Sequence, residues 1–265
     1  MGRINSARQS QTSSRKLFPR LFSLWGSYRR LILLAAITGV LVSFVLSLSS
    51  TTRRSLVTGL LAQQGLVALL LLFSLLTLSL LWSAGQRLDT WIFLLFNLRG
   101  FHPYWLDRLM WAVTQIGNGV AGILLGAFLY FTGYRGLATQ LLLGILSLWL
   151  AVELIKALVE RTRPFLVLEG ARIIGWRERG KSFPSGHTAQ AFFMTTLLAH
   201  HFEAGGLLSS VLYGVAGLVA LTRIYVGAHY PRDVIAGAVL GSVWGLLGGL
   251  VEGYLSAGQL QRLIF

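Results

Sequence analysis

Long hydrophobic runs, separated by short polar segments, dominate the chain. A helix needs roughly 20 apolar residues to cross the hydrocarbon core of a bilayer, and seven runs approach that length. We predict spanning helices at Leu31–Ser49, Gly65–Ser83, Met110–Thr132, Leu137–Leu158, His187–Phe202, Leu207–Arg223 and Val234–Gly253. The pattern therefore predicts an all-α fold, a polytopic transmembrane helix bundle.

Two segments break this pattern. Residues 1–30 are rich in Arg and Ser and carry no signal-peptide pattern, so we interpret them as a basic tail. In Asp89–Trp105, aromatic side chains alternate with charged ones. Such mixing is typical of the headgroup zone, and it predicts an interfacial helix over this range.

Composition strengthens the membrane assignment. Hydrophobic residues make up 54% of the chain and charged residues 12%, with a mean hydropathy of +0.67, which excludes a soluble globule. The 23 Lys and Arg residues against 9 Asp and Glu give a net charge of +14, which suits contact with anionic lipid or an anionic substrate. The absence of cysteine excludes a thiolate metal site and a cysteine nucleophile.

A first polar stretch follows the fourth predicted helix. Lys156 and Arg163 are seven residues apart, which places them two turns apart on one helix face, and Pro164 is expected to end that helix. By itself this pair also fits basic side chains that reach towards lipid headgroups.

A second stretch, Pro184-Ser-Gly-His187, opens the fifth predicted helix. Ser185 suits an N-cap, and Gly186 allows the backbone to approach a ligand closely. The first-turn N–H groups would then form an anion site that His187 can reach. The same four residues also fit a turn that only starts a helix.

A third stretch joins the sixth and seventh predicted helices and contains Arg223, His229 and Asp233. His229 and Asp233 are four apart at the start of a helix whose first turn carries Pro231. The carboxylate can accept a hydrogen bond from one imidazole nitrogen and leave the other free to react. A purely structural hydrogen bond is the alternative for this pair.

The predicted topology brings the three stretches to one membrane face. With seven crossings, the end of the fourth helix, the start of the fifth, the end of the sixth and the start of the seventh lie on the same side. Permanent cations, a helix N-terminus and two histidines in one pocket favour a phosphate-like anion. The residues expected to meet there are Lys156, Arg163, Ser185, Gly186, His187, Arg223, His229 and Asp233.

Together, the three stretches resemble the signature of the type 2 phosphatidic acid phosphatase (PAP2) superfamily, which is K-x6-R-P, P-S-G-H and S-R-x5-H-x3-D. The likeness covers about Asp89–Gly253, and Thr222 stands where the family usually has Ser. The resemblance implies a six-helix core, to which this chain would add one N-terminal helix. The expected organisation is a tail at 1–30, an extra helix and loop at 31–64, and the phosphatase domain at 65–265.

The resemblance also implies roles for the site residues. His229 would be the nucleophile that attacks phosphorus, and Asp233 would fix its tautomer. His187 would be the general acid and then the general base that activates water. The phosphate would be bound by Lys156, Arg163, Ser185, Gly186 and Arg223.

We predict neither a metal nor another cofactor, because a metal-dependent phosphatase would need several converging carboxylates. Glu160, Glu169 and Glu178 lie near the motifs, but in a segment crowded by Arg and Lys. We interpret that segment as a solvated loop that attracts anionic headgroups or sets topology. Glu153 is expected to be the ion partner of Lys156.

The expected activity is hydrolysis of a lipid phosphomonoester or diphosphate. We favour a polyprenyl diphosphate such as undecaprenyl diphosphate, followed by phosphatidate and phosphatidylglycerol phosphate. The alternatives are a lipid phosphotransferase that uses the same phosphohistidine and a non-enzymatic lipid transporter. The expected partners are the lipid phosphate substrate and membrane lipids, with no nucleic acid, and the oligomeric state stays open.

Two signals on orientation disagree. The side that holds the tail carries ten Lys and Arg against four on the other, which places the tail and the site in the cytoplasm. The family resemblance implies a site that faces away from the cytoplasm. We favour the extracytoplasmic face of a cell membrane, which requires that Leu31–Ser49 does not cross.

Overall fold

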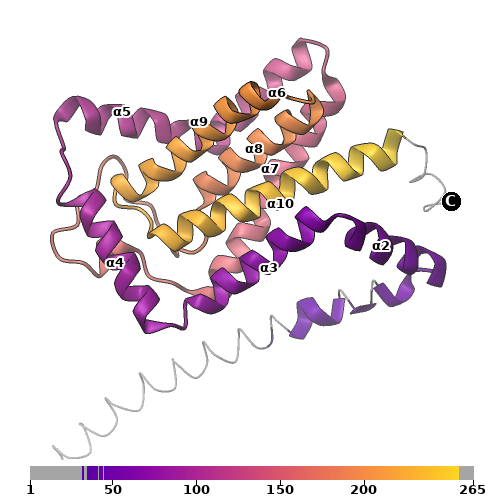
Figure 1. The fold of residues 1–265 in the computed structure, drawn as a ribbon, viewed down its shortest axis with the longest axis horizontal. Helices are drawn as coiled ribbons and strands as arrows, with labels where there is room; N and C mark the ends of the chain where they lie inside the picture. Colours follow the sequence, from indigo (N-terminus) through magenta and orange to yellow (C-terminus); the bar gives the residue numbers. More distant parts are fainter. Residues whose placement is uncertain (1–31, 33–34, 41, 44, 257–265) are drawn as a thin grey trace, which may run out of the picture. The chain divides into compact units, whose positions relative to one another are not determined.

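The computed structural model describes residues 32, 35–40, 42–43 and 45–256, whose regular structure is helical, as predicted (Figure 1). The helices are α2 (Ser50–Ala62), α3 (Gln64–Ser79), α4 (Ser83–Asn97), α5 (Tyr104–Thr114), η1 (Gln115–Gly117), α6 (Gly119–Phe131), α7 (Arg135–Val159), η2 (Pro164–Leu166), α8 (Gly186–His201), α9 (Gly206–Tyr225) and α10 (Pro231–Ser256). Residue contacts divide the chain into units at 1–58 and 59–265.

Only part of the first unit is described. Residues 35–40, 42–43 and 45–47 are helical, within the predicted helix Leu31–Ser49. The predicted basic tail at 1–30 lies outside the described residues. The predicted boundary between residues 64 and 65 stays a prediction.

The prediction of uninterrupted spans is wrong for two of the ranges. Among the residues described, three segments contain a helix long and apolar enough to cross a membrane: Arg135–Leu166, which contains α7, Gly206–Tyr225 and Pro231–Leu250. Two bent pairs can each supply a further span: α3 with α4, bent by 95°, and α5–η1 with α6, bent by 56°. Helix α8, with 16 residues, is shorter than a full crossing.

Polar side chains explain both breaks. Asn118 caps α6, because its Oδ1 accepts a hydrogen bond from Val120 N at 3.0 Å. At the end of α3, the carbonyl oxygen of Ser79 accepts from Arg232 Nη1 at 2.5 Å, and that of Leu80 accepts from Gln86 Nε2 at 2.7 Å. The carbonyl groups freed at that helix end are thus satisfied by side chains.

The expected interfacial helix over Asp89–Trp105 is also corrected. The range contains the end of α4, a short loop and the start of α5. One face of α4 is buried at Asp89, Phe93 and Asn97. Asn97 Nδ2 donates to the carbonyl oxygen of Tyr225 at 2.8 Å, so α4 is fastened to the end of α9.

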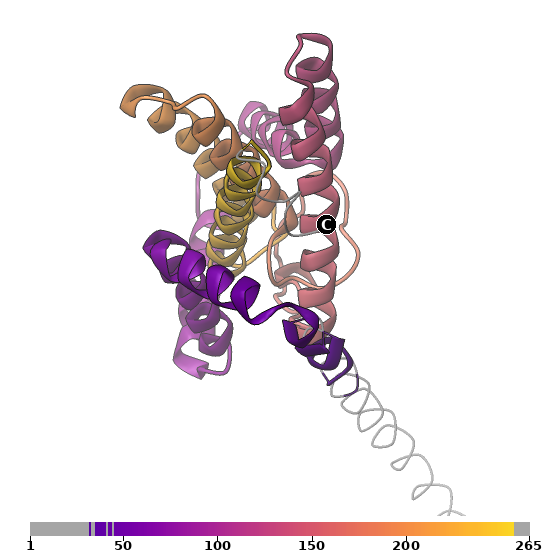
Figure 2. The same ribbon diagram turned by 90° about the vertical axis from the view of Figure 1, so that its right-hand side faces the viewer.

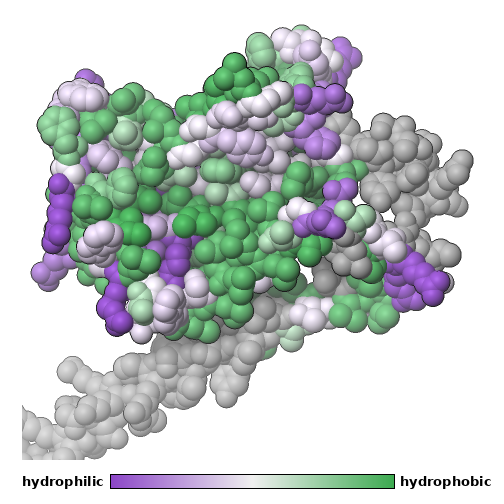
Figure 3. All heavy atoms as spheres, in the orientation of Figure 1, coloured by the Kyte–Doolittle hydropathy of each residue, from purple (hydrophilic) through white to green (hydrophobic). Residues whose placement is uncertain are grey.

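The outward surface of the second unit suits lipid. Large apolar side chains are exposed along α3, α6, α7 and α9, and hydrophobic residues cover much of the face in Figure 3. Contiguous apolar surface of this extent is unfavourable in water but is matched to the hydrocarbon core of a bilayer.

The centre of the second unit is the pair α8 and α10, which lie side by side over most of their length (Figures 1 and 2). Gly237, Gly241 and Gly245, one helical turn apart on α10, make this approach possible. A Cβ atom at these positions would lie 2.5 Å from Ser185 O, 2.0 Å from Ala189 O and 2.5 Å from Thr196 Cβ. Small residues at this spacing are typical of close helix contacts in membranes.

This packing places the start of α8 against the start of α10. Ser185 N donates to the carbonyl oxygen of Asp233 at 2.9 Å, so the N-cap of one helix is bonded to the first turn of the other. The second and third polar stretches are therefore held together by backbone contacts.

We predict that Gly241→Ala destabilises the protein, because the added methyl group meets backbone that cannot move aside. The expected loss is roughly 1–3 kcal/mol, as for other overpacked cores. Thermal unfolding of detergent-solubilised protein measures it. Gly217→Ala in α9 is the control, since a Cβ atom at that position would have no neighbouring atom within 4 Å. Equal unfolding temperatures for the two variants would contradict the close-packing argument.

Candidate active site

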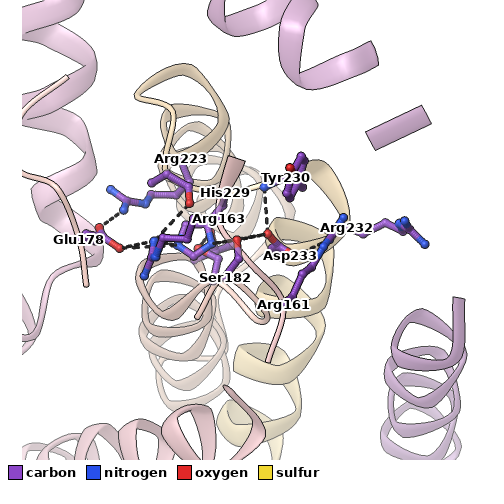
Figure 4. A network of polar contacts seen from close by, with 12 residues as sticks. Arg161, Arg163, Glu178, Ser182, Arg223, His229, Tyr230, Arg232 and Asp233 are labelled. Carbon is purple, nitrogen blue, oxygen red and sulfur yellow. Dashed lines mark hydrogen bonds and ion pairs between the residues drawn. The ribbon is translucent and has the colours of Figure 1, made fainter. Parts of the chain in front are cut away.

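Arg163 of the first polar stretch lies beside residues of the third (Figure 4), and the start of α8 is bonded to the third through Ser185 N and the carbonyl oxygen of Asp233. Arg163 follows α7, Arg223 lies in the last turn of α9, His229 lies in the loop between α9 and α10, and Asp233 lies in the first turn of α10. Arg163 Nη1 is 3.2 Å from His229 Nε2, which joins the first stretch to the third. The predicted meeting of these stretches at one place is thus present in the structure.

One expected detail of the first stretch is wrong. Helix α7 ends at Val159, and Glu160 follows in a left-handed conformation with φ of 53°. Arg163 therefore lies in extended backbone rather than on the helix face of Lys156. Pro164 disfavours helical backbone at the residue before it, which agrees with this geometry.

The carboxylate of Glu178 lies at the centre of the site. It pairs with Arg163 Nη1 at 2.8 Å and makes a short contact with Arg223 Nη2. It is also 3.7 Å from His187 Nδ1 and 3.7 Å from His229 Nε2. Two guanidinium groups and both histidines therefore surround one anionic group.

The surroundings of Glu178 determine its ionisation. Burial raises the pKa of this carboxyl group, but the contact with His229 and the charge of Arg223 outweigh burial and lower the pKa below its usual range. Glu178 is thus anionic at neutral pH. The interpretation of its segment as a solvated loop is wrong at this position, since the side chain turns into the site and is 27% exposed.

The contacts of His229 indicate its tautomer. An arginine can only donate, so the 3.2 Å contact with Arg163 Nη1 identifies Nε2 as an acceptor with a free lone pair. The remaining proton then lies on Nδ1, which is 3.4 Å from Ser182 Oγ. Ser182 in turn donates to Asp233 Oδ2 at 2.5 Å.

Ser182 replaces the direct hydrogen bond that the His229–Asp233 spacing predicts. The His229 Nδ1 to Asp233 Oδ2 distance is 3.8 Å, which is too long for a hydrogen bond. The serine hydroxyl lies between them and links carboxylate to imidazole. Sequence reasoning missed Ser182 because it lies in a loop with no periodic pattern and outside the three stretches.

The other predicted residues lie close to this centre. Lys156 pairs with Glu153 at 2.7 Å, as expected, and lines a cavity together with Arg163, Gly186 and His187. Ser185 is the N-cap residue of α8, as predicted. Its hydroxyl is buried and lies 3.0 Å from Thr188 Oγ1, so its role as a phosphate ligand stays a prediction.

Two cavities meet at Glu178 and His187. One, of about 360 Å³, is lined by Trp111, Phe165, Trp176 and Arg223 among others. The second, of about 480 Å³, is lined by Leu148, Trp149, Val152, Lys156 and Arg163 among others. Each cavity thus joins an apolar wall to a cationic end.

The site contains several cationic side chains that can together bind one anion from outside the protein. Arg223 Nε is buried and has no hydrogen-bond partner among the described residues, so an oxyanion can still be bound there. Within the described part of the chain, no group of three His, Cys, Asp or Glu is arranged to hold a metal ion. The arrangement favours an oxyanion bound by guanidinium and ammonium groups.

Comparisons with known proteins agree with this chemistry. The family model described as "PAP2 superfamily" matches residues 137–254. Phosphatidylglycerophosphatase B of Bacillus subtilis is 29% identical over 57% of this chain and 75% of its own. Undecaprenyl-diphosphatase of Sulfolobus acidocaldarius is 28% identical over 74% of this chain and 93% of its own.

The fold is shared with a solved structure. The crystal structure of a transmembrane PAP2-type phosphatidylglycerolphosphate phosphatase from Bacillus subtilis superposes with a TM-score of 0.63 at 24% identity. The match covers 71% of this chain and 96% of that one. The predicted all-α transmembrane fold is therefore confirmed.

We predict that Glu178→Gln strengthens binding of orthovanadate, a phosphate-like oxyanion. The carboxylate must leave the two arginines before another anion binds, and a neutral amide leaves more easily. The expected gain is about tenfold, the order of one charged hydrogen bond. Titration of purified protein with orthovanadate measures it.

The control for this experiment is Glu169→Gln, a substitution at a glutamate of the same loop that is not among the residues lining the site. It removes the same charge from the protein without touching the site. Weaker binding by Glu178→Gln alone would show that the carboxylate supports the anion site instead of competing for it.

Proposed function

We propose that this chain, a multi-pass membrane lipid phosphatase of the PAP2 superfamily, hydrolyses its substrate through a phosphohistidine on His229. The observation that carries the proposal is the position of Glu178. Its carboxylate is bound by Arg163 and Arg223, within 3.7 Å of His187 and of His229. A substrate phosphate that replaces this carboxylate lies between a nucleophile and an acid.

The first half-reaction transfers the phosphoryl group. The lone pair of His229 Nε2 attacks phosphorus, a P–N bond forms, and the bond from phosphorus to the leaving oxygen breaks. Protonated His187 gives its proton to that oxygen, which yields a lipid alcohol or, from a diphosphate, a lipid monophosphate. The proton on His229 Nδ1 stays in place, held through Ser182 by Asp233.

The second half-reaction releases phosphate. His187, now neutral, accepts a proton from water as the water oxygen attacks phosphorus. The P–N bond breaks, inorganic phosphate is formed, and His229 regains its lone pair while His187 is again protonated. Both steps need an acid–base group near the phosphate, and the contact of His187 with Glu178 places it there.

Positive charge supplies the remaining stabilisation. Phosphoryl transfer depends mainly on positioning and on neutralising the equatorial oxygens. In this proposal Arg163, Arg223 and Lys156 provide that charge, and the N–H groups at the start of α8 add donors. Ser185 and Gly186 complete this phosphate cradle.

The cavities favour an amphiphilic substrate. Leu148, Trp149 and Val152 line the cavity that ends at Lys156 and Arg163, and Trp149 is 57% exposed on the outer side of α7. A lipid chain can lie along this wall while its phosphate reaches the cations. This geometry supports entry of the substrate from the bilayer.

We propose a polyprenyl diphosphate as the preferred substrate and phosphatidylglycerol phosphate as the second candidate. The similarity to the undecaprenyl-diphosphatase extends over most of both chains, which supports the first. The similarity to phosphatidylglycerophosphatase B supports the second. We further propose that the site faces away from the cytoplasm, as the family resemblance implies.

We predict that purified protein releases inorganic phosphate from lipid phosphates, fastest from undecaprenyl diphosphate. Phosphatidylglycerol phosphate and phosphatidate complete the panel. His229→Ala and His187→Ala should each reduce turnover by at least about 100-fold, because each removes a group that bonds to a reacting atom. Orthovanadate should inhibit, and EDTA should leave turnover unchanged.

His200→Ala is the matched control, since His200 is exposed in the last turn of the same helix, α8. Normal turnover by His229→Ala would overturn the phosphohistidine mechanism. Phosphate found on a lipid or sugar acceptor instead of in solution would identify a phosphotransferase.

A further inference from the structure

A second buried ionic group lies beside the active site. Arg161 Nη1 contacts Asp233 Oδ1 at 2.5 Å, and Arg161 Nη2 makes a short contact with Asp89 Oδ2. Arg232 Nε contacts the same oxygen of Asp89 at 2.7 Å. The side chains of Asp89 and Asp233 are 3% and 0% exposed, and those of Arg161 and Arg232 are 8% and 12% exposed.

The charges of this group balance: two carboxylates face two guanidinium groups. Breaking a buried ion pair by removing one partner is costly, because an uncompensated charge remains. Further contacts fix Arg161, whose Nη2 donates to Gln86 Oε1 at 2.8 Å and whose guanidinium carbon lies 4.3 Å from the centre of the Tyr230 ring. The guanidinium plane is therefore held on several sides.

Arg161 acts on the catalytic residues in two ways. Its side chain binds the oxygen of Asp233 that Ser182 does not use. Its carbonyl oxygen accepts a hydrogen bond from Ser182 N at 2.7 Å. One residue therefore fixes both the carboxylate and the hydroxyl that link Asp233 to His229.

The anchor of Arg161 comes from a distant part of the chain. Asp89 lies on α4, and the family match begins only at residue 137. Asp89 Oδ1 also accepts from the backbone N–H of Arg232 at 3.1 Å, in the first turn of α10. Helix α4 is thus bonded directly to the residue next to Asp233.

We propose that Arg161, oriented by Asp89, is a positioning residue for the nucleophile: it fixes Asp233 and Ser182 and thereby the orientation of His229. This inference rests on the proposed role of His229. Arg161 does not line either cavity that meets at His187, so it acts through Asp233 and Ser182 and not on the substrate.

Arg161→Gln tests the proposal. We expect kcat to fall by roughly 10–100-fold with little change in KM, because a misplaced nucleophile affects the chemical step and not the binding of phosphate.

Two further variants separate positioning from folding. Asp89→Asn combined with Arg161→Gln leaves one carboxylate, Asp233, and one guanidinium group, Arg232, so the buried charges balance again. If Arg161 only balances charge, this double variant regains both the thermal stability and the kinetics of the parent. If it positions the nucleophile, stability recovers while kcat stays low.

Arg161→Lys keeps the charge but cannot bind two carboxylates through a planar fork. We expect it to restore thermal stability more than kcat, which separates the charge of Arg161 from its geometry. Parental kcat in folded Arg161→Gln would overturn the inference.

His229→Ala, measured alongside, keeps the two proposals apart. If His229→Ala is active, the phosphohistidine mechanism fails. If His229→Ala is inactive and Arg161→Gln resembles the parent, only the positioning role fails.

Discussion

Positive charge gathered at one end of an apolar helix bundle needs an anion, and this requirement determines the site. Arg163 and Arg223 are nearly fully buried, so neither can be neutralised by solvent. Glu178 supplies the anion from the loop before α8. Because a phosphate carries more charge and more acceptor oxygens than a carboxylate, the same groups favour it over Glu178 whenever it reaches them.

The close packing of α8 on α10 holds this geometry in place. In the middle of the two helices, Gly241 of α10 lies against the backbone of α8, and at their first turns the helices are joined by the Ser185–Asp233 hydrogen bond. Apolar surface faces outward, so lipid contacts alone do not fix how the helices are rotated. The glycine contacts and the polar network fix that rotation, and the histidines on different elements therefore lie close to the same carboxylate, that of Glu178.

The sequence predicted the residues that are proposed to react with or bind phosphate better than the residues that hold them in position. Lys156, His187, Arg223 and their partners stand at the spacings of the family signature, and the predicted topology brings their three stretches together. Glu178 and Ser182 lie in an irregular loop, where no periodicity tells which side chain turns inward. The break at the end of α3 was missed because it depends on a distant polar partner, Arg232.

The two carboxylates nearest His229, those of Asp233 and Glu178, differ in the groups that neutralise their charge. Asp233 is fully buried, and its carboxylate accepts hydrogen bonds from Arg161, Ser182 and the N–H of Tyr230. None of these groups is proposed to bind the substrate. Glu178 is partly exposed and bound mainly by Arg163 and Arg223, the groups proposed to bind phosphate. In the proposed mechanism an incoming phosphate displaces Glu178 and leaves Asp233 in place, so the imidazole keeps its orientation while phosphate replaces the carboxylate.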